Sequence, residues 1–192
     1  MHTLVHDDLL SLERYARERG EFRARAMTHK RARSVHLGAH LTLLFEDRVT
    51  VQYQVQEMLR IERIFEPEAI AEELATYNPL IPDGHNLKAT LLIEYPDIDE
   101  RRRALENLRD IEHHIALQVA DHAPVLAIAD EDLPRSNDSK TAAVHFLRFE
   151  LTAMIAAWRA GAVVTLRATL PAHRVETRLD AAQQVALAAD FD

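Results

Sequence analysis

The chain contains no cysteine among its 192 residues. This absence excludes disulfides, thiolate metal sites, cysteine-ligated iron–sulfur clusters and cysteine nucleophiles. It also means that cysteine usage gives no indication of the cellular compartment.

Glycine is scarce, with four residues, and no GxGxxG or Walker pattern is present, so a phosphate-cradling loop is not expected. The patterns GxSxG and HExxH, typical of serine hydrolases and zinc proteases, are absent as well. No apolar run approaches about 18 residues, so we expect no membrane-spanning helix. The N-terminus MHTLVHDDLL carries acids where an export signal carries positive charge, which favours a cytoplasmic protein.

Positive charge is concentrated near the N-terminus of a chain whose net charge is −8. Residues 1–33 hold eight Lys and Arg against five Asp and Glu, whereas the remainder holds fifteen against twenty-six. An acidic bulk argues against nucleic-acid binding. The basic residues form either a solvated helix face or a docking surface for an acidic protein partner. The candidates for docking are Arg23, Arg25, Lys30, Arg31 and Arg33.

The periodicity of apolar residues predicts an α+β fold, with a helical N-terminal half packed on a mostly antiparallel sheet of about five strands. The domain prediction is a helical region 1–80 and an α+β sheet region 81–192, which together form one compact unit. A helix capped by Asp7 or Asp8 is expected to stop or bend at Gly20. The further helices are expected at 21–33, 50–65, 67–77, 97–108, 152–159 and from 180 onwards. The strands are expected at 34–47, 87–95, 115–120, 125–129, 143–151 and 162–170.

The segment 50–65 predicts an amphipathic helix packed against the C-terminal sheet. On a helical wheel Glu62 falls among the apolar residues Val51, Val55, Met58 and Leu59, so its carboxylate is expected to be buried. A buried carboxylate requires a cation, a metal or a proton. One interpretation is an ion pair with an arginine such as Arg48 or Arg148. The other is a metal site.

The metal hypothesis combines Glu57 and Glu62 with a histidine, His145 or His40, as ligands for iron, manganese or zinc. The repeated Glu-x-x-His pattern of di-iron bundles is missing, because Arg60 stands three residues after Glu57. His145 shares strand parity with apolar neighbours. It is therefore either a hydrogen-bonded core residue or a ligand or acid–base group.

Four stretches carry a resemblance to a known family: DDLLSLERYARER, THKRARSVHLGAHLTLLFEDRVTVQYQVQEMLRIERIFE, YNPLIPDGHNLKATLLIEYPD and AVHFLRFEL. Through them nearly the whole chain resembles the bacterial domain-of-unknown-function family DUF3501. The resemblance transfers no catalytic residue, since none is assigned in that family. It implies genes that neighbour rubrerythrin and heterodisulfide-reductase-like iron–sulfur proteins, and therefore an accessory role in oxidative stress or electron transfer.

Three function hypotheses follow. The leading one is a non-catalytic, homo-oligomeric accessory partner of an iron–sulfur oxidoreductase or rubrerythrin. The second is a metal-binding protein or metal-dependent enzyme that uses Glu and His ligands. The third is a small-molecule binding module whose pocket lies between the central helix and the sheet.

Overall fold

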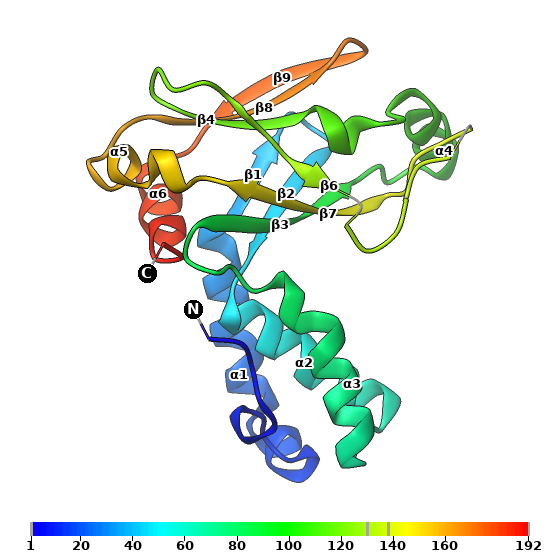
Figure 1. Ribbon diagram of the computed structural model, residues 1–192. Coiled ribbons are helices and arrows are strands. Elements are labelled where there is room, and N and C mark those ends of the chain that lie inside the picture. The colour runs from blue at the N-terminus through cyan, green and yellow to red at the C-terminus, as the bar shows by residue number, and fades with distance from the viewer. Residues whose placement is uncertain (1, 130, 138, 192) are drawn as a thin grey trace.

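The computed structural model describes residues 2–129, 131–137 and 139–191 (Figure 1). These residues form helices and antiparallel sheets, and the predicted α+β class is confirmed. The α-helices are α1 (Leu12–Ala32), α2 (Arg48–Glu62), α3 (Pro67–Tyr77), α4 (Ile98–Asn107), α5 (Ile155–Arg159) and α6 (Ala181–Ala188). The strands are β1 (Ser34–Leu37), β2 (Leu41–Glu46), β3 (Asn86–Ile93), β4 (Ile115–Val119), β5 (Val125–Leu126), β6 (Ile128–Ala129), β7 (Val144–Glu150), β8 (Val164–Leu170) and β9 (His173–Arg178).

The strands form two sheets, where the sequence predicted one. The first sheet has five strands in the order β1-β2-β3-β7-β6, and the second has four in the order β5-β4-β8-β9. The first sheet draws β1 and β2 from the region before residue 80 and its other strands from the region after it. The two predicted regions, 1–80 and 81–192, therefore share one sheet.

The main core lies between the two sheets, whose inner faces are formed by apolar residues that alternate with polar ones along the strands. Phe45, Leu91 and Phe149 of the first sheet belong to the same buried cluster as Leu117 and Leu166 of the second. Each of these five side chains is at most 1% exposed. This packing leaves the other face of the first sheet free to meet the N-terminal helices.

Helices α1, α2 and α3 form a helical arm that projects from one end of the first sheet (Figure 1). In this arm α2 packs mainly against α1 and α3, so the prediction that α2 packs on the C-terminal sheet was wrong. The arm has a small core of its own, made of Leu4, Val51, Val55, Leu59, Ile70, Leu74 and Ile81. Arm and sheets thus have separate apolar cores.

Helix α1 is continuous through Gly20, contrary to the predicted break. A Cβ at this position would meet no atom within 4 Å, so the packing around Gly20 does not require a glycine. The helix is capped by Ser11, whose Oγ accepts from the backbone N–H of Arg14 at 3.3 Å. The predicted caps Asp7 and Asp8 lie in a short 3₁₀ turn before the helix.

No helix in the part of the chain that the structure describes combines the length and apolar character needed to cross a membrane.

Candidate functional site

The outer face of the first sheet, which points away from the second sheet, carries a row of charged side chains. Antiparallel register places Glu46 of β2 opposite Lys88 of β3, and Lys88 opposite Arg148 of β7. A second row on the same face, two residues further along each strand, contains Leu44, Thr90 and Phe146. Directly opposite residues have Cβ atoms about 4.5–5.5 Å apart, so each row is a set of touching neighbours.

A cleft separates this outer face from the helical arm. Its main cavity has a volume of about 570 Å³ and is lined by Thr76, Tyr77, Pro79, Leu80, Lys88, Glu131, Asp132, Arg135, Phe146, Leu147 and Arg148. A smaller cavity of about 260 Å³ shares three of these residues, Tyr77, Leu80 and Phe146, and extends between α2 and the sheet. Cavities of this size accommodate small organic molecules.

Lys88 is a half-buried cation on the floor of the cleft. Its Nζ donates to the carbonyl oxygen of Pro79 at 2.6 Å. Burial lowers the pKa of Lys88, the charge of Asp83 raises it, and the neighbouring Arg148 lowers it. The structure thus places two positive side chains beside each other in a partly desolvated place.

Arg148 is held by two carboxylates. Its Nε and Nη2 donate to the two carboxylate oxygens of Glu131 at 2.8 and 2.7 Å, and its Nη1 donates to Glu150. The hydrogen bonds between Arg148 and Glu131 raise the pKa of Arg148 and lower that of Glu131. The sequence offered Arg148 as a partner for Glu62, whereas the structure pairs it with Glu131 and Glu150.

A third cation, Arg135, closes the cleft from the side of the loop after β6. Its guanidinium carbon lies 4.7 Å from the centre of the Phe146 ring, a cation–π geometry. It also pairs with Asp132, which holds the pKa of that carboxyl at about 2, mainly through the hydrogen bond from Arg135. The cleft therefore combines three cations, two carboxylates and an aromatic wall. Such a set is suited to an ionic ligand that also has an apolar part.

Of the two carboxylates predicted as metal ligands, Glu57 is hydrogen-bonded to neighbouring side chains and Glu62 is exposed. Glu57 accepts from Tyr15 at 2.6 Å and from Arg19 at 2.8 and 2.9 Å, and it also pairs with Arg60. Glu62 is exposed at the last residue of α2, where the chain turns towards α3. The prediction that Glu62 faces a core was wrong, because the core of the arm covers α2 as far as Leu59, and residues 60–63 that follow are exposed.

The two predicted histidine ligands lie in different surroundings. His40 stacks on Tyr95 with ring centres 3.9 Å apart and contacts the Glu94 carbonyl through Nδ1 at 3.0 Å. His145 is fully buried, and its Nε2 lies 2.9 Å from Thr141 Oγ1 and 3.0 Å from the Ala142 carbonyl oxygen. Among the described residues, no three His, Asp or Glu side chains are grouped so that they could hold a metal. The structure does not bring Glu57, Glu62, His40 and His145 together.

A second buried carboxylate lies beside His145. Glu112 is 0% exposed, and its Oε2 is 3.8 Å from His145 Nε2. Thr141 donates to Glu112 at 3.3 Å, and Ser136 donates to Glu112 while its Oγ lies 2.8 Å from Thr141 Oγ1. Because these groups bond one another inside the core, the network anchors the loop before β7 to the turn before β4.

Of the five predicted docking residues, three have exposed side chains and two pack against other parts of the protein. Arg23, Arg25 and Arg31 are exposed on α1, whereas Lys30 is half-buried with its Nζ 5.5 Å from the centre of the Tyr53 ring. Arg33 is only 2% exposed. It donates to Asp190 and to three backbone carbonyls, so its assignment to a docking surface was wrong.

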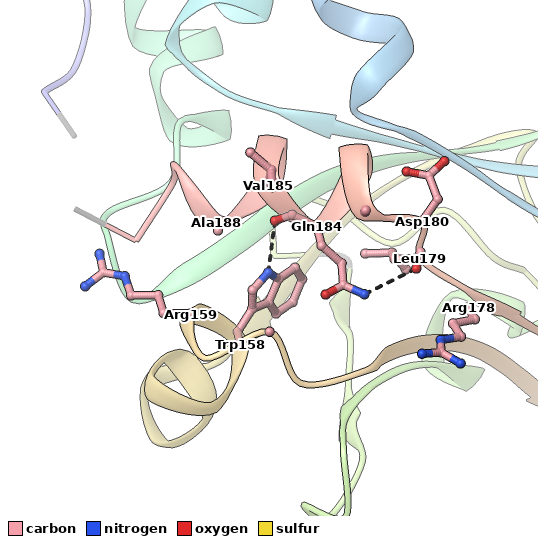
Figure 2. A pocket seen from close by; sticks show the side chains of 10 residues that line it. Trp158, Arg159, Arg178, Leu179, Asp180, Gln184, Val185 and Ala188 are labelled. Carbon is pink, nitrogen blue, oxygen red and sulfur yellow. Dashed lines mark hydrogen bonds between the residues drawn. The ribbon is translucent and has the colours of Figure 1, made fainter.

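Another cavity, of about 740 Å³, lies between α5 and α6 (Figure 2). Its polar groups serve the packing of these helices: Trp158 Nε1 donates to the Gln184 carbonyl at 3.0 Å, and the Gln184 amide donates to the Leu179 carbonyl at 3.3 Å. Arg159 and Arg178 lie at opposite ends of the view and do not point towards each other. The cleft beside the arm, where charges converge, is the stronger candidate site.

The charged residues of the cleft were missed because their grouping depends on which strands are neighbours. Lys88 and Arg148 stand at polar positions of two alternating strands, a pattern that is visible in the sequence. Nothing in that pattern indicates that β3 pairs with β7, or that Glu131 folds back onto Arg148.

Comparison with known proteins identifies relatives over the full length of the chain. A protein of unknown function from Burkholderia pseudomallei K96243, solved by crystallography, is 50% identical, with all of both chains covered and a TM-score of 0.94. No curated protein matches the chain. The family described as "Protein of unknown function (DUF3501)" matches residues 3–191. The chain therefore belongs to the DUF3501 family.

Proposed function

We propose that the protein is a small-molecule binding module whose ligand occupies the cleft between the helical arm and the first sheet. The observation that carries this proposal is the 570 Å³ cavity with Lys88 and Arg148 on its floor and Phe146 beside them. Binding pockets typically combine mostly apolar walls with a few convergent polar groups. Tyr77, Leu80 and Phe146 supply the apolar part of this cleft.

The proposal is tested by filling the cleft from a position that tolerates a large side chain. Thr76 lines the cavity from the last turns of α3 and is exposed, so Thr76→Trp should block the cleft without disturbing a core. Thr28→Trp, at an exposed position of α1, is the matched control. After dialysis against a bacterial metabolite extract, native mass spectrometry should show a bound small molecule on wild type and on Thr28→Trp.

Loss of that adduct in Thr76→Trp is the expected result. An adduct that persists equally in Thr76→Trp would place the ligand elsewhere. A wild-type protein that carries no small molecule after dialysis would contradict the binding function.

An accessory role in an iron–sulfur or rubrerythrin-type redox system is a separate proposal, which rests on the resemblance and on the exposed arginines of α1. If α1 docks an acidic redox partner, replacing Arg23, Arg25 and Arg31 with Ala should slow association and flatten its dependence on salt. Unchanged association would remove this role. The metal-binding alternative has less support, because the structure separates its four candidate ligands.

A further inference from the structure

Arg148 binds the carboxylate of Glu131 in the way that an arginine binds the carboxylate of a ligand. The two Glu131 oxygens lie 2.8 and 2.7 Å from Nε and Nη2, a bidentate arrangement in which the planar guanidinium matches the planar carboxylate. Glu131 comes from the loop that follows β6, and it lines the cleft. A side chain of the protein therefore occupies the place where an external carboxylate would bind.

Lys88 makes this place more favourable for an anion than a lone arginine would. It stands directly opposite Arg148 in the sheet, and two like charges in this relation normally destabilise a sheet. The hydrogen-bond acceptor of Lys88 is a neutral carbonyl, that of Pro79. The negative charge of Glu131 acts on both cations, and a ligand carboxylate that replaced Glu131 would take over this role.

The neighbouring surface indicates what the rest of the ligand is like. Phe146 is two residues before Arg148 on the same strand face, and Tyr77 and Leu80 line the cavity from the arm. A ligand with its charge at Arg148 would therefore lay its body on aromatic and aliphatic side chains.

On the basis of the proposed function, we propose that the cleft binds a small carboxylic acid with an apolar or aromatic body, whose carboxylate displaces Glu131 from Arg148. Lys88 provides the second cation. Glu131 acts as an internal competitor that keeps Arg148 paired when no ligand is bound.

The probe for this proposal is 3-phenylpropionate, measured by isothermal titration calorimetry and compared with its uncharged amide. Glu131→Gln removes the competing charge, and it should bind 3-phenylpropionate about threefold to fivefold more tightly than wild type, as expected for an exposed ion pair. Glu150→Gln is the matched control, because Glu150 also pairs with Arg148 but does not line the cavity. Its affinity should stay within about twofold of wild type, a difference well below 1 kcal/mol.

Arg148→Ala should weaken binding about tenfold or more, since it removes a charge-assisted bidentate pair. Arg148→Lys keeps the charge without the bidentate geometry, so it separates loss of recognition from loss of folding. Equal affinity of wild type and Glu131→Gln, or equal affinity for the acid and its amide, would overturn the carboxylate assignment. Tighter binding of phenylphosphonate than of the carboxylate would overturn it in favour of a phosphate-like anion.

The two proposals fail in different ways. If Thr76→Trp leaves the bound metabolite in place, the cleft is not the site. If Thr76→Trp removes it but Glu131→Gln does not tighten 3-phenylpropionate, the site stands and only the ligand class is wrong.

Discussion

At the scale of single residues, Glu57 provides the charge that joins the first two helices. Its side chain is 12% exposed and accepts hydrogen bonds from Tyr15 and Arg19 of α1. The hydrogen bond from Arg19 is the main cause that lowers the pKa of Glu57 to about 2, against the opposing effect of burial. A group whose pKa is depressed by folding stabilises the fold above its ordinary value near pH 4.5 and loses that effect as pH falls towards 2.

Glu57→Gln should therefore lower the free energy of unfolding at pH 7 by about 2 kcal/mol, because it leaves Arg19 without its charged partner. Glu62→Gln, at an exposed position of the same helix, should change it by less than about 0.5 kcal/mol. Urea denaturation of both variants at pH 7 and near pH 2.5 measures these differences. The difference between Glu57→Gln and wild type should shrink at the lower pH. A Glu62→Gln variant as unstable as Glu57→Gln would contradict the assignment.

At the scale of elements, α1 shows that one glycine does not interrupt a helix when the residues around the glycine favour helical structure. Gly20 lies among Arg, Glu and Phe residues, and the 21 residues of α1 form a single helix. Glycine is unfavourable in a helix because of its conformational freedom in the unfolded chain, and not because its helical geometry is poor.

Gly20→Ala should raise the free energy of unfolding by roughly 0.5–1 kcal/mol, since the new Cβ points into open space. Gly38→Ala is the contrasting case. Gly38 has a φ of +74° in the turn between β1 and β2, and a Cβ there would lie 3.4 Å from a Val175 methyl. This variant should lose roughly 1 kcal/mol or more. Thermal melts of the two variants should shift in opposite directions, and a shift in the same direction would refute this explanation.

Most elements could be predicted from the sequence, because their periodicity is local. The alternation of residues 87–95 predicted β3, and Pro67 at a helix start predicted α3. Strand β9 was missed because its six residues, HRVETR, contain one apolar side chain and lie at the edge of the second sheet. The helical wheel misplaced Glu62 because a wheel shows the direction of a side chain. It does not show which turns of the helix are covered by other elements. The cleft depends on strand order, which no local pattern records.

At the scale of the whole molecule, Arg33 ties the end of α1 to the C-terminal segment. Asp190 is 1% exposed, and it shares Arg33 with Asp47, whose carboxylate lies 3.5 Å from Arg33 Nη1 and 2.5 Å from His29 Nε2. Burial raises the pKa of Asp190 to about 6, although the charge of Arg33 opposes this shift and that of Asp47 adds to it. A group whose pKa is raised by folding costs stability as pH rises through the interval between its unfolded and folded values.

The free energy of unfolding of wild type, relative to that of Asp190→Asn, should therefore fall by about 2 kcal/mol between pH 4 and pH 7. The amide introduced by this substitution cannot ionise, and Arg33 keeps its backbone acceptors in the variant. Asp99→Asn, at an exposed pair on α4, is the control and should follow the wild-type pH profile. Parallel profiles for wild type and Asp190→Asn would show that Asp190 does not titrate in this interval.

The strand order of the first sheet also determines how the chain can fold while it is being synthesised. β3 is the central strand, yet its partner β7 begins 51 residues after β3 ends, at Val144. Until β7 leaves the ribosome, one edge of β3 carries unpaired backbone groups, and such an edge can pair with another chain. The β1–β2 hairpin and the helical arm can form early, because their contacts are local. A nascent chain stalled before residue 144 should therefore be prone to aggregation and need a chaperone, whereas one released after residue 150 can complete this sheet.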